Sequence, residues 1–247
     1  MNCKLIEDWF SSAKSSVQKL TLGNGVETIG YRAFSGFSAI TSVTIPSSVT
    51  SIGTEAFSGC SGLTAVNITD LTAWCSISFD DNPLSYAHHL FLNGTEVKDL
   101  VIPDGVTTIG GSAFNGCSDL TSVIIPSSVT SIGKEAFYGC NSIRKVYSLS
   151  EKPCSIENSF TENVYKRAIL YVPNGCKAIY RSTAGWNLFA NIVEFDPEIL
   201  GVDAVKGNDE AAESAFYTLD GKKHQQKQRG MNIVRMSDGT VRKVSVK

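Results

Sequence analysis

Hydrophobic residues recur along this chain with a period of about 23 residues between Leu20 and Val172. Aligned on one apolar position, the copies begin at Leu20, Val43, Val66, Leu100, Val123, Val146 and Leu170. The steps between these positions are 23, 23, 34, 23, 23 and 24 residues. A fixed period of this length is typical of a solenoid, in which no coil can bury its apolar face alone and stacked neighbours form the core. The pattern predicts a right-handed, β-rich solenoid of about seven coils.

The copy that starts at Val43 shows how one coil is expected to fold. Val43 and Ile45 alternate with a polar residue, which predicts a strand with one buried face, and Pro46 ends it because proline has no N–H for a neighbouring strand. Gly53 is expected to permit a sharp change of direction. Phe57 follows on a short helical turn that points into the interior. The same phenylalanine position recurs and predicts a ladder of stacked rings, formed by Phe34, Phe57, Phe114, Phe137 and Phe160.

The 34-residue step marks one irregular copy. Its segment LFLNGTEV predicts a hairpin with a tight turn at Asn93-Gly94, because both central positions of such a turn need positive φ. Several possible metal ligands lie in the insertion: Asp80, Asp81, Asn82, His88 and His89. Adjacent histidines on a strand point in different directions and cannot easily bind one ion. We therefore expect no metal site here, but a solvated loop in which one histidine is hydrogen-bonded.

Three of the seven cysteines occupy one column of the repeat. Cys60, Cys117 and Cys140 each follow a repeat phenylalanine by three residues, which predicts small buried thiols. The sequence has no C-x-x-C motif, and it indicates no role for the other four cysteines.

The ends of the chain are expected to differ from the solenoid. Residues 1–19 are predicted to form an N-terminal cap, residues 20–198 the solenoid with its closing coil, and residues 199–247 a linker and a small β tail. Trp186 and Phe189 are expected to plug the last coil. In the tail we predict three short strands, with turns at Asp220-Gly221 and Asp238-Gly239.

Composition narrows the class of protein. The chain has 42% hydrophobic and 19% charged residues and a net charge of −2, which is ordinary for a globular protein and gives no long-range attraction to nucleic acid. No apolar run reaches the length of a transmembrane helix. Residues 1–10 lack the apolar core of a secretory signal. Either a signal has been removed, the start is misassigned, or the protein stays in the cytoplasm.

The repeat motif L-x-x-V-x-I-P-x-x-V-x-x-I-G-x-x-A-F-x-x-C, seen in residues 63–68, 100–117 and 120–140, resembles the BspA-type leucine-rich repeats of bacterial surface proteins. The resemblance covers residues 20–195. It implies a leucine-rich-repeat solenoid in a cell-surface or secreted protein that adheres to host matrix proteins or to other cells. The tail resembles the C-terminal sorting tails of secreted bacterial proteins in YTLDG and SDGTVRKVSVK, and departs from them at HQQKQR.

The outward-facing position of each first strand suggests where a partner binds. The column is polar in the early copies (Thr21, Thr44, Asn67) and apolar or aromatic in the later ones (Val101, Ile124, Tyr147, Tyr171). These last four residues are predicted to form a contiguous exposed stripe that binds a protein. Two alternatives remain open: the tail folds over the stripe, or the residues simply have high strand propensity.

The functional expectation is a non-enzymatic module that binds a protein, either a host matrix protein or another cell-surface protein. Neither a catalytic nor a cofactor-binding motif of the G-x-S-x-G, H-E-x-x-H or P-loop type occurs, and no cofactor is expected. Carbohydrate binding through Trp74, Trp186 or the surface tyrosines is a second possibility, which an exposed tryptophan would favour. A purely structural spacer is a third.

Overall fold

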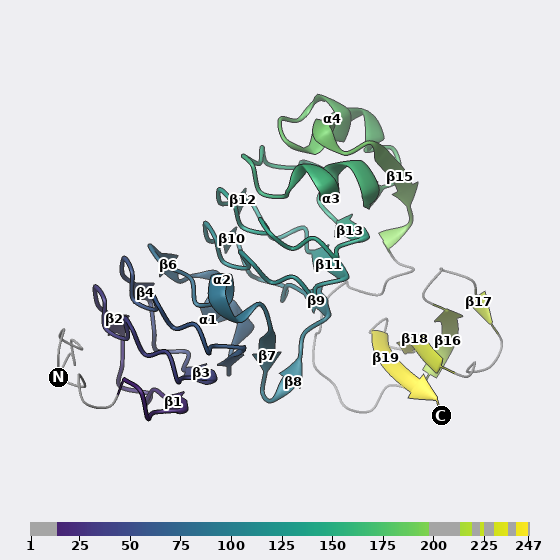
Figure 1. Ribbon diagram of the computed structural model, residues 1–247. Helices are drawn as coiled ribbons and strands as arrows, with labels where there is room; N and C mark the ends of the chain where they lie inside the picture. Colours follow the sequence, from purple (N-terminus) through teal and green to yellow (C-terminus); the bar gives the residue numbers. More distant parts are fainter. Residues whose placement is uncertain (1–13, 198–212, 219–222, 225–229, 237–240, 247) are drawn as a thin grey trace.

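The computed structural model describes residues 14–197 and the strands at 213–218, 223–224, 230–236 and 241–246. Within residues 14–197 the chain winds into a stack of coils (Figure 1), and two sheets run along one wall of the stack. The first sheet contains β1 (Lys19–Thr21), β3 (Ser42–Ile45), β5 (Ala65–Ile68), β7 (Leu90–Leu92) and β8 (Thr95–Glu96) in that spatial order. The second contains β9 (Asp99–Val101), β11 (Ser122–Ile125), β13 (Lys145–Ser148), β14 (Ile169–Pro173) and β15 (Asn191–Phe195).

Shorter strands form the opposite wall of each coil. β2 (Thr28–Ile29), β4 (Ser51–Ile52) and β6 (Ser78–Phe79) pair in parallel, as do β10 (Thr108–Ile109) and β12 (Ser131–Ile132). The backbone N–H of Gly110 donates to the carbonyl of Cys75 at 2.8 Å, which links the two groups. The two groups are separate sheets, and this bond joins them through Cys75, which precedes β6 in the chain.

The interior is built from equivalent positions of successive coils. Val43 pairs with Leu20 on one side and Val66 on the other, and Val123 pairs with Leu100 and Val146. A residue of one coil thus lies directly over its counterpart 23 residues away, which confirms the predicted solenoid. The phenylalanine ladder is confirmed within each half of the stack, with ring centroids 5.5 Å apart for Phe34–Phe57, 5.3 Å for Phe114–Phe137 and 5.0 Å for Phe137–Phe160. The irregular copy separates the two runs of rings.

The 34 residues from Val66 to Leu100 contain one more stacked strand than we expected. Leu90 in β7 pairs with Val66, so the buried column gains a member that the sequence alignment omitted. Ile192 in β15 pairs with Leu170 and extends the column again at the far end. The description as seven coils is therefore too simple, because the wall that carries the two sheets has additional strands.

The predicted hairpin is present and bends the stack. β7 and β8 pair antiparallel, and the turn between them has φ of 50° at Asn93 and 79° at Gly94. The hairpin adds strands to one wall only, each about 4.8 Å wide, while β6 and β10 remain neighbours on the other wall. Figure 1 shows the consequence: the stack turns at this point, with β7 and β8 on the outside of the turn and β6 and β10 on the inside.

The repeated glycine before each alanine–phenylalanine pair has a different role from the one predicted. Gly53 does not adopt positive φ; a Cβ there would lie 3.0 Å from the backbone nitrogen of Tyr31 in the coil below. The change of direction occurs two residues later, where Glu55 has φ of 57° and its counterpart Glu135 has φ of 59°. Gly53 is therefore required because the backbones of two coils approach closely at this point. The residue in the left-handed conformation is a glutamate, not a glycine.

In residues 14–197 the helices are short and lie outside the sheets. They are α1 (Leu71–Cys75), α2 (Leu84–Ala87), α3 (Glu162–Arg167), α4 (Lys177–Ser182) and a 3₁₀ helix (Trp186–Leu188). No helix in the described part of the chain is long and apolar enough to cross a membrane. In the closing coil, Trp186 is buried among Phe160, Tyr180 and Phe189, as predicted for a plug.

The C-terminal region forms an antiparallel sheet. Its spatial order is β17 (Lys223–His224), β16 (Glu213–Thr218), β18 (Gly230–Met236) and β19 (Val241–Val246). The two-residue strand β17 is additional to the three that the sequence predicts. The turns expected at Asp220-Gly221 and Asp238-Gly239, and most of the predicted N-terminal cap, lie outside the described residues.

Candidate functional site

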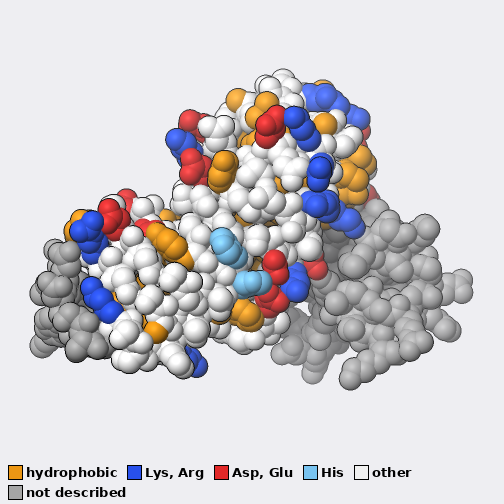
Figure 2. All heavy atoms as spheres, viewed as in Figure 1, with side chains coloured by type: hydrophobic (Ala, Val, Ile, Leu, Met, Phe, Trp, Pro, Cys, Tyr) orange, Lys and Arg blue, Asp and Glu red, His pale blue; other side chains and the backbone are white. Residues whose placement is uncertain are grey.

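The predicted stripe is a continuous row on the outward face of the second sheet. Ile124 pairs with Val101 and Tyr147, and Tyr147 pairs in turn with Tyr171. The register extends the row to Val193 in β15. Val101 and Val193 are 44% and 43% exposed, while Ile124 and Tyr171 are partly buried. Figure 2 shows hydrophobic side chains gathered along the β14–β15 side of the molecule.

An aromatic cluster lies in the middle of this row. The rings of Tyr147 and Tyr171 stack with centroids 4.6 Å apart and planes 13° apart, and the ring of Phe195 meets both at steep angles. Tyr147 is only 9% exposed, which differs from the predicted exposure. Burial raises the pKa of its hydroxyl to about 12, with smaller contributions from Tyr171 and Asp99. Aromatic rings on neighbouring strands bury one another because strand spacing matches ring stacking distance.

The corresponding row on the first sheet is mostly polar. Thr21 is exposed, Thr44 and Asn67 are partly buried, and the row then reaches Phe91, which pairs with Asn67. Phe91 was not among the predicted outward residues because the sequence alignment did not identify β7 as a stacked strand. The apolar character is thus concentrated on β9–β15, and Phe91 is the apolar member of the row on the first sheet.

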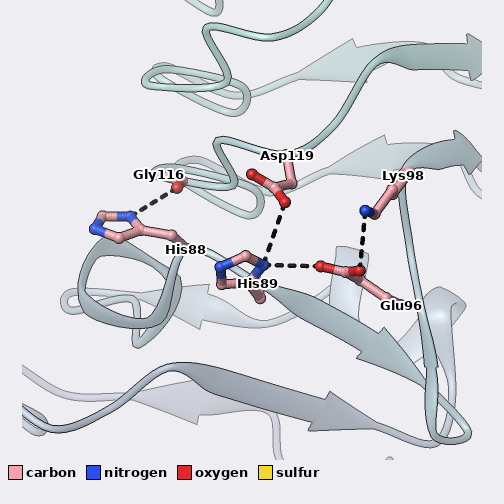
Figure 3. A network of polar contacts seen from close by, with 6 residues as sticks. All are labelled: His88, His89, Glu96, Lys98, Gly116 and Asp119. Carbon is pink, nitrogen blue, oxygen red and sulfur yellow. Dashed lines mark hydrogen bonds and ion pairs between the residues drawn. The ribbon is translucent and has the colours of Figure 1, made fainter.

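A second cluster is polar and lies where the two sheets meet (Figure 3). His89 Nδ1 lies 2.8 Å from Glu96 Oε1 and 3.4 Å from Asp119 Oδ2. Lys98 Nζ lies 3.3 Å from the other carboxylate oxygen of Glu96. The hydrogen bond with His89, and then Lys98, lowers the pKa of the Glu96 carboxyl below its ordinary value. His88 instead contacts the carbonyl of Gly116 at 3.0 Å, so both histidines have partners rather than the single one expected.

The other polar residues of the insertion hold the coils together. Asp81 accepts a hydrogen bond from the backbone N–H of Phe57 at 2.9 Å, and burial raises the pKa of its carboxyl. Asn82 is 3% exposed and donates to the carbonyls of Ser112 and Ala113 in the next coil. Neither joins the two histidines. Glu96 and Asp119 approach His89 instead. The sequence offers no signal for Asp119, because it lies 30 residues away in an ordinary copy.

The repeat cysteines are buried and free, as predicted. The thiols of Cys60 and Cys140 donate to the carbonyls of Phe34 and Phe114. Burial raises the pKa of Cys60 to about 11 and that of Cys117 to about 12. A thiol held neutral in this way is a poor nucleophile and metal ligand, so these residues have a packing role.

Two tryptophans bear on carbohydrate binding. Trp74 and Trp186 are each 1% exposed, and their indole N–H groups donate to the carbonyls of Ala113 and Cys154 at 2.8 Å. Neither presents a face on which a sugar ring can stack. The sequence-based argument for carbohydrate binding through these two residues therefore fails.

The sequence profile described as "BspA type Leucine rich repeat region" matches residues 4–86 and 84–184, in six copies. The chain belongs to this family. BspA-type leucine-rich-repeat proteins are bacterial surface proteins, and leucine-rich-repeat domains generally mediate protein interactions. No curated protein has a significantly similar sequence.

Solved structures with some likeness also contain leucine-rich repeats. A leucine rich cell surface protein of Faecalibacterium prausnitzii is 19% identical, with 64% of each chain covered and a TM-score of 0.29. A leucine-rich repeat protein of T. pallidum is 21% identical, with 68% of this chain and 83% of that chain covered and a TM-score of 0.31. One from Bacteroides ovatus is 20% identical, with 74% and 67% covered and a TM-score of 0.25. This chain thus spans less than two thirds of the F. prausnitzii protein, and superpositions this poor support no comparison of function.

Proposed function

We propose that this chain is a non-enzymatic, protein-binding module of a bacterial cell-surface or secreted protein. The partner is a host matrix protein or another cell-surface protein. It docks on the outward row of the second sheet, formed by Val101, Ile124, Tyr147, Tyr171 and Val193. We call this row the apolar row.

The observation that carries the proposal is the continuity of the apolar row across five neighbouring parallel strands. Its two ends are the exposed Val101 and Val193, and its centre is the Tyr147–Tyr171 stack. Large exposed apolar patches are uncommon on monomeric soluble proteins and often mark interaction sites. Tyrosine is also enriched in interfaces, because a ring fixed by stacking loses little conformational entropy on binding.

The matching row on the first sheet supplies a natural comparison. Thr21 and Thr44 occupy the same outward position on the same kind of strand, yet they are polar. If strand propensity alone had selected the apolar row, both sheets should show it, because both are built from the same repeat. The difference supports a function for the face of β9–β15.

The experiment measures binding of the full chain to immobilised fibronectin, laminin and collagen, and to whole host cells. The double variant Val101→Ser/Tyr171→Ser removes apolar area at two positions and leaves the buried Tyr147 in place. We expect a loss of binding of at least tenfold, because each truncated contact is worth about 1 kcal/mol or more at a binding site.

The matched control is Thr21→Ser/Thr44→Ser, which changes the same outward position on the first sheet. It should bind as the parent does. Equal binding by the parent and the Val101→Ser/Tyr171→Ser variant, with both variants folded by circular dichroism, would rule out the apolar row as the docking surface.

A further inference from the structure

The polar cluster at the junction of the two sheets has the composition of a metal site. It contains one imidazole and two carboxylates, supplied by His89, Glu96 and Asp119. Their nearest ligand atoms all lie within 4.8 Å of one another. Figure 3 shows the three side chains converging from two sides of the junction. Among the described residues, no other group of three histidine, cysteine, aspartate or glutamate side chains lies close enough together to share an ion.

We propose that His89, Glu96 and Asp119 bind a divalent transition-metal ion, with Zn²⁺ as the best-fitting species. The ion would be held by Nδ1 of His89 and one oxygen from each carboxylate. It would join the β7–β8 hairpin to the loop that precedes β11.

The separations between the ligand atoms support this assignment. Zinc lies about 2.0–2.2 Å from nitrogen and oxygen ligands, so two ligands of a tetrahedral ion are about 3.3 Å apart. Nδ1 of His89 is 3.4 Å from Oδ2 of Asp119, and 2.8 Å from Oε1 of Glu96. Small rotations of partly exposed side chains would place all three around one ion. Side-chain exposures of 39%, 26% and 39% for His89, Glu96 and Asp119 leave room for a water as the fourth ligand.

The ligand atoms indicate which metal would bind. An imidazole with carboxylates suits zinc and its first-row neighbours, whereas calcium and magnesium prefer oxygen ligands only. Nδ1 of His89 is the atom that faces both carboxylates, so it is the nitrogen that would coordinate. The two carboxylates supply the negative charge that a divalent ion needs.

Lys98 carries a positive charge that opposes the ion. Its ammonium lies 3.3 Å from Oε2 of Glu96 and leaves Oε1 directed at His89. The lysine orients the glutamate but adds a like charge near the ion. Removal of the lysine charge should therefore increase the affinity for the ion, whereas removal of a ligand should decrease it.

The backbone around the cluster holds the ligands in place. His89 precedes β7 and accepts a hydrogen bond at its carbonyl from the N–H of Val66 at 3.0 Å. Glu96 lies in β8, whose pairing with β7 is closed by a 2.8 Å bond from Val97 N–H to the carbonyl of Leu90. Asp119 follows Cys117, whose buried thiol contacts the backbone of Leu90. The metal would therefore link the two sheets on the wall where their strand pairing is interrupted.

The test is a calorimetric titration of the full chain with ZnCl₂ after removal of metals with EDTA. We expect one ion per chain at this site, and at least a tenfold loss of affinity in each of His89→Ala, Glu96→Gln and Asp119→Asn. Lys98→Gln should bind zinc several-fold more tightly than the parent. The matched controls are His88→Ala and Asp80→Asn, which should bind as the parent does.

Two further measurements separate this site from binding by cysteines and from a loss of folding. Cobalt bound at the proposed site should show visible d–d bands without a thiolate charge-transfer band. Zinc should raise the melting temperature of the parent but not that of Glu96→Gln, which retains the shape of the side chain. Absence of stoichiometric zinc binding by the parent, or zinc binding that survives all three ligand substitutions, would overturn the proposal.

Discussion

Replacement of Phe137 by alanine tests the stacked interior most directly. The Phe137 ring is fully buried and lies between the rings of Phe114 and Phe160, at centroid distances of 5.3 and 5.0 Å and interplanar angles of 6° and 10°. Its removal would leave a cavity that two rigid coils enclose from both sides.

The expected cost follows from that geometry. Truncation of a buried phenylalanine to alanine costs about 3–5 kcal/mol, and the cost is highest where the site cannot collapse. Each lost aromatic pair contributes about 0.5–1.5 kcal/mol of such a total. Because Phe137 has two stacked neighbours, we expect about 4–5 kcal/mol. Phe34→Ala should cost less, about 3 kcal/mol, because among the described residues its ring stacks on Phe57 alone and meets Phe37 edge-on.

The assay is urea unfolding followed by the fluorescence of the buried Trp74 and Trp186. The free energies are comparable only if the dependence on urea has the same slope in each variant. Phe137→Leu is the control, since it keeps most of the volume and should cost only about 1.5 kcal/mol. A cost below about 1.5 kcal/mol for Phe137→Ala, or equal costs for the leucine and alanine variants, would refute the stacked-core argument.

The remaining predictions concern thiols and glycines. Cys75 and Cys117 should resist alkylation at pH 8 until urea is added, as peptide mapping would show, because burial raises the pKa of each to about 12. Since folding raises the pKa of Cys75 from 9.0 to about 12, its stabilising effect is present below pH 9 and is lost as pH rises to about 12. The melting temperature should therefore fall over that range, and fall less in Cys75→Ala; an equal fall would contradict this. Gly133→Ala should cost about 1–3 kcal/mol by urea unfolding, because its Cβ would overlap the backbone of Gly111. Gly25→Ala, with no atom within 4 Å of its Cβ, should change stability little, and similar costs would disprove the close-approach explanation.

Much of the fold could be predicted from local patterns. The 23-residue period identified the buried column, the phenylalanine ladder and the repeat cysteines, because parallel stacking places residues one period apart in contact. The Asn93-Gly94 pair identified the hairpin, because its backbone conformation is a property of the turn itself. These features depend on short-range chemistry repeated many times.

The candidate sites were predicted less completely. The row from Val101 to Tyr171 was found from strand alternation, but the burial of Tyr147 depends on Phe195, which comes from a later strand. The cluster around His89 was missed because Asp119 approaches it only after the hairpin is added to one wall. Outside the repeat, sequence separation does not indicate which residues meet.

The sequence by itself determined the repeating coil, the residues that face inward and the class of protein, since these follow from a period that every copy restates. Only the tertiary structure decided the division of the 34-residue step, the turn of the stack and the meeting of His89, Glu96 and Asp119. The physical reason is that an inserted strand pair can lengthen one wall or both. Which wall is lengthened depends on which backbone hydrogen bonds between the coils remain next to the insertion, such as the bond between Gly110 and Cys75.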